Sequence, residues 1–237
     1  MMMAMARLNA LLPTALRLAS ALALTLGVAA CGDGYDPSLD TLGDFRLDVV
    51  TCKGMAGGGV AFEYLGRGDS TAVQLQSSLT ALPQGVKAGD RVLLRYSFRQ
   101  PQPDGGSAPR PISTYRCTRI VSDTVRLATA PNAQQHRSIK LRSLWRTGPY
   151  INLRCELEHA SLHRLGLLAD RATLGADTVV CHLVHDLAGT DTAYYWRDCY
   201  GSFFASNITG RPTCRVLRVA VNDEVKPTVK YYDFKIR

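Results

Sequence analysis

The stretch VLLRYSF, residues 92–98, carries a large apolar side chain at every second position. Successive side chains of a strand point to opposite faces of a sheet, so this alternation predicts a strand with one buried face. The same period recurs at residues 45–49, 60–64, 151–157, 179–183, 217–221 and 232–236. Glycine-rich turn signals lie between these segments, for example at residues 57–59 and 210–212. The sequence therefore predicts an all-β protein, a sandwich or a barrel. One short segment, ASLHRLGLLAD at residues 160–170, is the single candidate for a helix.

The predicted strands form two groups along the chain. The first group is expected at residues 45–52, 59–65, 70–79, 91–99 and 112–129. Five strands of this length suit a small Greek-key barrel such as the OB-fold, with the proline-rich stretch 100–111 as the loop between the fourth and fifth strands. The second group is expected at residues 138–146, 150–158, 176–187, 191–205, 211–222 and 226–236. Six such strands predict a β-sandwich. The polar stretch 130–136 marks the boundary, which gives an OB-like domain at 44–136 and a sandwich domain at 137–237.

The N-terminus carries a targeting pattern. Arg7 and Arg17 are the only charges in residues 1–30, and residues 18–30 are uncharged and almost entirely small or apolar. This apolar run is too short for a bilayer, which needs about 20 residues, but it is typical of a signal peptide. Residues 28–31, VAAC, resemble the lipobox of bacterial lipoproteins, in which the cysteine is acylated and becomes the new N-terminus. We therefore expect a signal peptide at 1–30 and lipidation of Cys31.

Residues 31–43 are expected to form a flexible tether between the lipid and the folded part. GDGYD, residues 32–36, loosely resembles the acidic tag that sends some outer-membrane lipoproteins to the cell surface. We expect an outer-membrane lipoprotein, and the sequence leaves the leaflet that it faces undecided. The net charge of +8 falls to about +6 without the two arginines of the signal. The arginines are spread along the chain without a block of like charge, so no nucleic-acid partner is expected.

Five segments, the lipobox among them, carry a resemblance to a known family. They are AGDRVLLRYSF at 88–98, GPYINL at 148–153, LVHD at 183–186, CYGSF at 199–203 and the lipobox. In their order and spacing they resemble the NigD-like lipoproteins of Gram-negative bacteria. The resemblance implies an N-terminal OB domain and a C-terminal β-sandwich. It also implies a non-catalytic binding role, for which bacteriocin immunity has been suggested in the family. The remaining alternative is a glycan-binding accessory lipoprotein of the outer-membrane surface.

Histidines and acids give no recognisable catalytic or metal site. His182 and His185 are three apart on a predicted strand and therefore face opposite sides. His159 and His163 would share a face only if their segment were helical. No serine or cysteine has a recognisable nucleophile setting beside Asp186. The chain is expected to have no catalytic residues, no metal and no cofactor.

A dense set of aromatic residues is a candidate ligand surface, although such residues more often form cross-strand pairs and core. The set comprises Trp145, Tyr150, Tyr194, Tyr195, Trp196 and Tyr200. The expected partners are the membrane, reached through Cys31, and an unknown protein or glycan ligand.

Six cysteines remain after Cys31, and an even number in an oxidising compartment permits up to three disulfides. If residues 191–205 and 211–222 form a hairpin that turns between Ser206 and Asn207, Cys199 lies opposite Cys214. The pairs Cys155–Cys181 and Cys52–Cys117 are further candidates. The competing interpretation is that Cys155, Cys181 and Cys199 are free core thiols.

Overall fold

The computed structural model describes residues 45–68, 71–99, 108–159, 163–187, 195–225 and 228–236. The expected signal peptide, Cys31 and the whole of the expected tether lie outside these residues. So do residues 100–107 of the proline-rich loop and the side chains of His159 and His163. Residues 43–237 form one compact unit.

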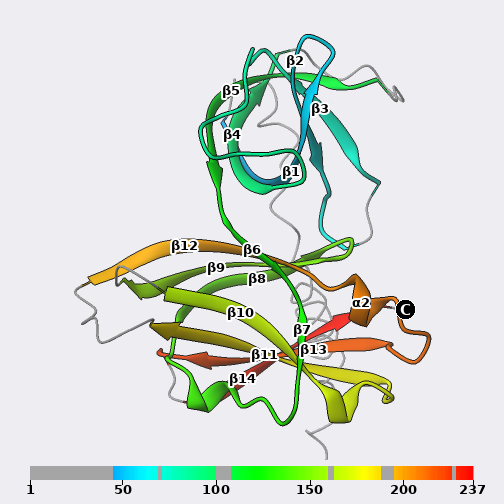
Figure 1. Cartoon of the computed structure of the whole chain (residues 1–237), viewed down its shortest axis with the longest axis vertical. Helices are drawn as coiled ribbons and strands as arrows, with labels where there is room; N and C mark the ends of the chain where they lie inside the picture. Colours follow the sequence, from blue (N-terminus) through cyan, green and yellow to red (C-terminus); the bar gives the residue numbers. More distant parts are fainter. Residues whose placement is uncertain are drawn as a thin grey trace, which may run out of the picture. The chain divides into compact units, whose positions relative to one another are not determined.

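The first five strands close into a barrel (Figure 1). They are β1 (Arg46–Ala56), β2 (Gly59–Tyr64), β3 (Val73–Ser77), β4 (Arg91–Phe98) and β5 (Arg110–Arg119). Their order around the barrel is β1-β2-β3-β5-β4, and β1 closes it by pairing with β4. The contact between β3 and β5 is parallel, and the other barrel pairs are antiparallel. The predicted OB-like five-stranded barrel is confirmed.

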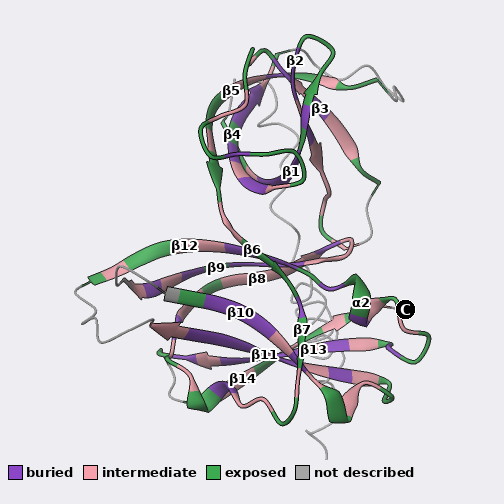
Figure 2. Cartoon of the chain, viewed as in Figure 1, coloured by how far each residue is buried: buried purple, intermediate pink, exposed green. Residues whose placement is uncertain are grey.

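The alternation of apolar and polar side chains along β4 determines which residues form the barrel core. Val92, Leu94 and Tyr96 are fully buried and belong to one core cluster, whereas Arg95 is exposed on the other face of the strand. The buried Tyr96 hydroxyl donates a hydrogen bond to the Asp48 carboxylate at 2.9 Å, so its polar end is satisfied. The period-two pattern of the sequence thus separates a barrel core from an outer face, as Figure 2 shows for the strands of the barrel.

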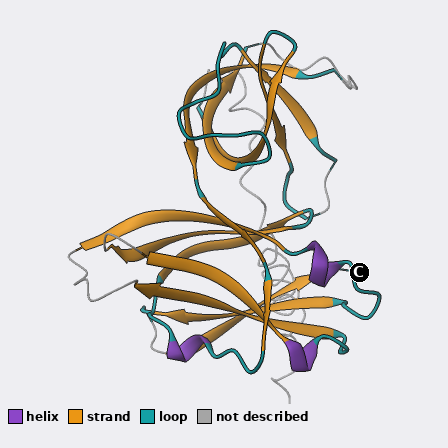
Figure 3. Ribbon diagram, in the orientation of Figure 1, coloured by secondary structure: helices purple, strands orange, loops and turns teal. Residues whose placement is uncertain are grey.

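The later strands form two sheets, which make the expected sandwich (Figure 3). The five-stranded sheet has the order β14-β13-β11-β10-β7, and the four-stranded sheet has the order β6-β12-β9-β8. The strands are β6 (Val121–Thr124), β7 (Arg126–Ala128), β8 (Lys140–Thr147), β9 (Tyr150–His159), β10 (His163–Asp170), β11 (Thr178–Leu187), β12 (Tyr195–Phe204), β13 (Val216–Asp223) and β14 (Thr228–Lys235). Short helices occur at η2 (Ala133–Gln135), η3 (Arg171–Thr173) and α2 (Ser206–Thr209). Residues from both sheets share one buried core, which includes Leu153, Phe203 and Leu217.

The strand expected at 112–129 is divided between the barrel and the sandwich, which corrects the sequence-based grouping. Its first part is β5 of the barrel, but β6 pairs in parallel with β12 and β7 pairs in parallel with β10. Val125, between β6 and β7, is buried in the sandwich core. The change from barrel pairing to sandwich pairing therefore lies at Ile120, before the expected boundary at 130–136. The two short strands have too few residues for their own alternation to reveal this change.

The one candidate for a helix, residues 160–170, is not helical over its described part, because residues 163–170 form strand β10. β10 pairs with β11 along seven residue pairs, from His163↔Leu187 to Ala169↔Cys181. Leu165, Leu167 and Ala169 alternate into the sandwich core. The central Gly166 disfavours a helix, and burial of the alternating residues decides for the strand.

The predicted hairpin of residues 191–205 and 211–222 is also wrong. β12 pairs with β9 and β6 in the four-stranded sheet, whereas β13 pairs with β11 and β14 in the other sheet. Between them the chain forms α2, with Ile208 buried in the core. The turn signal at Ser206–Gly210 therefore carries the chain from one sheet to the other.

A buried arginine joins the barrel to the sandwich. Arg91, at the start of β4, is 3% exposed and donates through Nε to the Ser202 hydroxyl of β12 at 2.9 Å. Its terminal nitrogens reach Thr51 of β1 at 2.9 Å and the Asn152 side-chain carbonyl of β9 at 3.2 Å. Burial lowers the pKa of Arg91 to about 10, so the guanidinium stays charged at neutral pH.

The groups that accept from Arg91 are themselves connected. Ser202 donates to the Asn152 carbonyl oxygen at 2.7 Å, and the Asn152 amide donates to Thr147 at 2.8 Å. The guanidinium also lies 4.2 Å from the centre of the Tyr150 ring. The buried Arg91 guanidinium depends on every one of these neutral acceptors, because removal of any acceptor would leave one of its N–H groups unpaired.

We expect Arg91→Ala to lower the free energy of unfolding by about 3 kcal/mol, because Ser202, Asn152 and Thr51 lose a charged donor in a buried place. Urea unfolding followed by tryptophan fluorescence measures this. The control is Arg119→Ala, an exposed arginine 3.6 Å from Asp90, which should cost under about 1 kcal/mol. Equal losses for the two variants would show that the Arg91 contacts do not carry this energy.

Fragments test where the sandwich begins. A fragment of residues 120–237 keeps β6, β7 and the buried Val125, whereas a fragment of residues 137–237 loses them. We expect the longer fragment to be more stable by at least about 2 kcal/mol, the usual cost of emptying a buried aliphatic site. Chemical denaturation of both fragments provides the measurement, and identical midpoints would contradict the assignment of β6 and β7 to the sandwich.

Candidate binding groove

A groove lies where β5 of the barrel and β12 of the sandwich diverge. β6 pairs with β12 only from Val121↔Gly201 to Thr124↔Phe204, because the barrel strand β5 ends at Arg119, two residues before Val121. The resulting cavity has a volume of about 610 Å³. We call it the arginine groove. It is lined by Phe45, Arg46, Leu47, Leu93, Arg95, Arg116, Thr118, Arg119, Ile120, Val121, Arg154, Leu157, Arg197, Asp198, Cys199 and Tyr200.

One wall of the groove is the edge of β12. The four consecutive residues 197–200 line it, although consecutive side chains of a strand alternate between the two faces. Contact with successive residues therefore means that the backbone edge itself faces the groove. Among the described strands, only β9 pairs with β12 over residues 196–200, so the other edge has no strand beside it. Such an edge offers N–H and C=O groups to an added strand.

Six arginines line the groove and give it a positive charge. Arg46 and Arg95 come from β1 and β4, Arg116 and Arg119 from β5, and Arg154 and Arg197 from β9 and β12. Asp198 is the single acidic residue of the lining, and it accepts from Arg154 at 3.2 Å. This hydrogen bond raises the pKa of Arg154. Asp90, outside the lining, lies 3.6 Å from Arg119. Two acids against six bases still leave an excess of positive charge.

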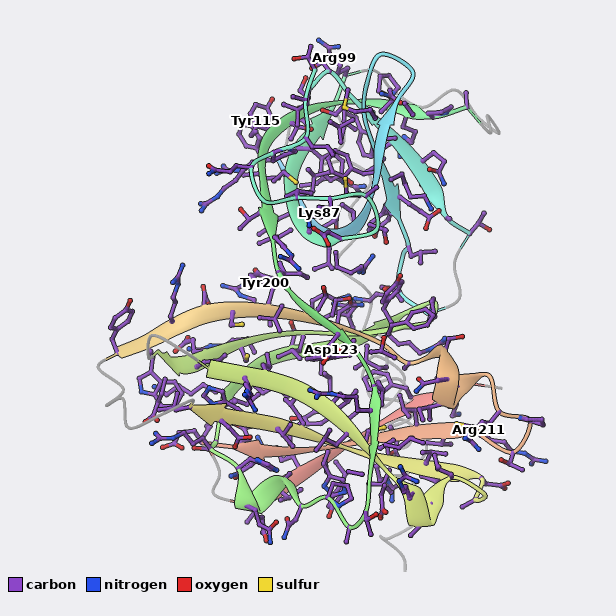
Figure 4. All side chains as sticks on the ribbon, in the orientation of Figure 1. Lys87, Arg99, Tyr115, Asp123, Tyr200 and Arg211 are labelled. Carbon is purple, nitrogen blue, oxygen red and sulfur yellow. The ribbon has the colours of Figure 1, made fainter. Side chains whose placement is uncertain are left out.

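Aromatic rings hold several of these arginines in place. The Arg95 guanidinium lies 4.7 Å from the centre of the Phe45 ring, and that of Arg154 lies 5.7 Å from the centre of the Tyr200 ring. Arg116 donates from Nε to the Thr118 hydroxyl at 3.2 Å. Figure 4 labels Tyr200, the β12 residue whose ring lies beside Arg154. Guanidinium groups held in this way keep further donors for a ligand, and they suit carboxylate, phosphate or sulfate groups.

Sequence reasoning missed this groove. The six arginines are spread from residue 46 to residue 197 without a block of charge, which argued against a basic patch. The fold brings them together because β1, β4 and β5 are barrel neighbours and β9 and β12 pair in the sandwich. The outward positions of the predicted strands are the one signal in the sequence, since Arg95 already alternates with the buried Leu94 and Tyr96.

The histidines of β11 face opposite sides, as their spacing predicts. His185 is 1% exposed, whereas His182 is partly exposed and accepts from the backbone N–H of Ala133 at 3.2 Å. Burial lowers the pKa of His182. Asp186 is hydrogen-bonded to His136 at 2.8 Å, a pair that sequence reasoning missed. Within the described residues, no group of three or more His, Cys, Asp or Glu side chains could hold a metal ion.

Trp145, Tyr150, Trp196 and Tyr200 lie on the outer face of the four-stranded sheet, whereas Tyr195 lies on the same side of β12 as Arg197 and Cys199, which pair with the buried Leu157 and Cys155. Trp145 pairs in register with Asn152, and Tyr200 pairs with Arg154, on the face opposite to the buried Leu153 and Cys155. Trp196 lies below the Lys140 ammonium, 3.8 Å from it, and Tyr195 is 56% exposed. None of the described members is buried in the core, but Tyr150 forms the expected kind of cross-strand pair with Phe204, with ring centres 5.4 Å apart. Tyr194 lies outside the described part of the chain.

The cysteines have different neighbours from those expected. All six described cysteines are free thiols in this structure. Because β12 and β13 lie in different sheets and do not form a hairpin, Cys199 does not lie opposite Cys214. Cys155 on β9 instead lies directly opposite Cys199 on β12, and Cys181 lies in the other sheet. Cys52 and Cys117 both contribute to the barrel core, and their pairing stays a prediction.

Comparison with solved structures identifies the architecture. A NigD-like immunity protein from Bacteroides caccae matches with a TM-score of 0.56 and 19% identity, over 80% of this chain and 96% of that one. The chain shares the fold of a NigD-like protein. The resemblance drawn from the sequence is therefore confirmed at the level of the fold.

Two further solved structures have the same arrangement. A protein of unknown function from Bacteroides vulgatus matches with a TM-score of 0.63 and 17% identity, over 81% of this chain and 90% of that one. A candidate lipoprotein from Bacteroides fragilis matches with a TM-score of 0.56 and 12% identity, over 82% and 99% of the two chains. No protein-family model and no curated protein matches the chain. No helix within the described ranges is long and apolar enough to cross a membrane.

Proposed function

We propose that this chain is a lipid-anchored protein of the outer membrane that acts by binding and not by catalysis. Its recognition surface is the arginine groove, and its partner is an acidic protein segment in extended conformation. The observation that carries this proposal is the coincidence of six arginines with the open edge of β12. An added strand pairs with the free edge through its backbone, and its acidic side chains meet the arginines.

The fold supports this class of function. One protein with the same architecture is named an immunity protein and another a candidate lipoprotein. An immunity-like role, in which the groove captures an acidic segment of a bacteriocin, agrees with a protein partner. The alternative is an accessory lipoprotein that binds an anionic glycan, because sulfate and carboxylate groups of a glycan also suit guanidinium groups.

Defined probes separate these two functions. The first probe is a fluorescein-labelled peptide that alternates glutamate with valine, and a lysine–valine peptide of equal length is its control. Fluorescence anisotropy should show binding of the acidic peptide alone, weakening as salt is added. Tighter binding of a sulfated oligosaccharide than of the peptide would favour the glycan function, and binding of neither would overturn the groove as the recognition surface.

The double variant Arg116→Ala/Arg197→Ala should weaken binding of the acidic peptide by about tenfold or more, because the two guanidinium groups are together worth about 1.4 kcal/mol or more. Arg218→Ala is the matched control, since Arg218 is an exposed arginine outside the lining that pairs with Asp233 at 2.7 Å. The arginine groove is not the binding surface for the acidic peptide if the Arg218 variant loses as much affinity as the double variant.

Lipidation gives an independent prediction. Cys31→Ala should remove palmitate labelling and release the protein from the membrane fraction, because an acyl-modified cysteine is the expected anchor. Metabolic labelling and membrane fractionation measure both effects. A variant that remains labelled and membrane-bound would show that the anchor lies elsewhere.

A further inference from the structure

Two cysteines face each other across the strands that carry one side of the groove. Cys155 on β9 and Cys199 on β12 are directly opposite partners in an antiparallel ladder of ten residue pairs. Directly opposite residues have Cβ atoms about 4.5–5.5 Å apart, close to the Cβ spacing of about 3.5–4.5 Å in disulfides. Both lie on the inward face of the sheet, with Leu153 and Leu157 as the flanking residues of β9.

The geometry points to a cross-strand disulfide between Cys155 and Cys199 in the mature protein. The inference rests on the proposed envelope location, because disulfides persist in oxidising compartments. It differs from the pairings that the sequence suggested, Cys199–Cys214 and Cys155–Cys181. Its consequence for the protein is a covalent connection between the two strands that supply Arg154, Arg197, Asp198 and Tyr200 to the arginine groove.

The two thiols differ in a way that suits bond formation. Cys155 is fully buried, whereas Cys199 is partly exposed and lines the groove, which gives an oxidant access to its sulfur. The hydrogen bond between the two thiols lowers the pKa of Cys199 and raises that of Cys155. Cys199 is therefore the attacking thiolate and Cys155 the second thiol.

The reaction is a thiol–disulfide exchange with the disulfide of an envelope oxidoreductase. The Cys199 thiolate attacks one sulfur of that disulfide, which forms a mixed disulfide and releases one thiolate of the oxidoreductase. Cys155 then gives up its proton and attacks the Cys199 sulfur, which forms Cys155–Cys199 and releases the second thiolate. Two electrons pass to the oxidoreductase, whose disulfide becomes two thiols.

Peptide mapping of the full chain tests the bond. Protein from the envelope is blocked with N-ethylmaleimide without reduction, digested with chymotrypsin and analysed by mass spectrometry. Chymotrypsin is the suitable protease because Pro212 follows Arg211, so trypsin leaves Cys199 and Cys214 on one peptide. A linked pair of peptides that contain Cys155 and Cys199 is expected. Alkylation of both cysteines, or a link from Cys199 to another cysteine, would overturn the inference.

Cysteine variants distinguish the stabilising effect of the disulfide from that of side-chain packing. Cys155→Ala, Cys199→Ala and the double variant should each lower Tm by roughly 5–10 °C, equally, since losing either sulfur loses the whole bond. Dithiothreitol should remove most of the difference from wild type. Cys52→Ala, in the barrel core, is the control in which the linked Cys155 and Cys199 peptides should still be found. Additive losses that persist under reduction would indicate packing alone.

A further experiment tests the Cys155–Cys199 disulfide independently of the proposed envelope location. Protein made without residues 1–30 in the cytosol is first reduced and then incubated with oxidised glutathione. Formation of the Cys155–Cys199 link there supports the geometry even if the Cys31 experiment shows that the envelope location is wrong. If the link does not form under these conditions, the inference is overturned whatever the location.

Discussion

The structure depends on one buried cation. Arg91 begins β4 of the barrel, and its guanidinium donates to Ser202 and Asn152, which belong to the sandwich. A second link lies nearby in the fold, where Gly68 after β2 bridges to Thr147 at the end of β8. Because a buried guanidinium requires acceptors for its donors, the contact between barrel and sandwich at Arg91 depends on Ser202 and Asn152. This requirement positions β4 beside β12 and β9.

The groove follows from that position. The chain leaves the barrel through β5, becomes β6 at Val121 and pairs with β12 at once. β5 and β12 therefore diverge before Val121, and their side chains leave a cavity between them. Since β6 covers only the second half of β12, the first half keeps an open edge beside the arginines. The same arrangement that connects the two parts also creates the surface that we propose for binding.

The Cys155–Cys199 pair lies in the strands that border this surface. A ladder of ten residue pairs already aligns β9 with β12, and a disulfide would fix that alignment where β6 no longer covers the edge. An open edge that pairs with a partner strand must not slip in register, because a shift by one residue turns every side chain to the other face. A covalent bond between Cys155 and Cys199 would keep β12 from slipping against β9, so that the edge beside Arg197 and Tyr200 would present one fixed register to such a strand.

The sequence by itself determined the fold class, most strands and the burial of alternate residues, because period-two patterns are local. Val92, Leu94 and Tyr96 are buried as their spacing predicts. Tertiary structure alone decided the strand β10, where burial of Leu165 and Leu167 outweighs a helix-like composition, and the transfer of β6 and β7 to the sandwich. It also decided the neighbours of Cys199 and the gathering of arginines from residues 46 to 197. The physical reason is that alternation shows which face of a strand is buried but not which strand lies beside it. Partner choice depends on long-range packing, which leaves no local pattern in the sequence.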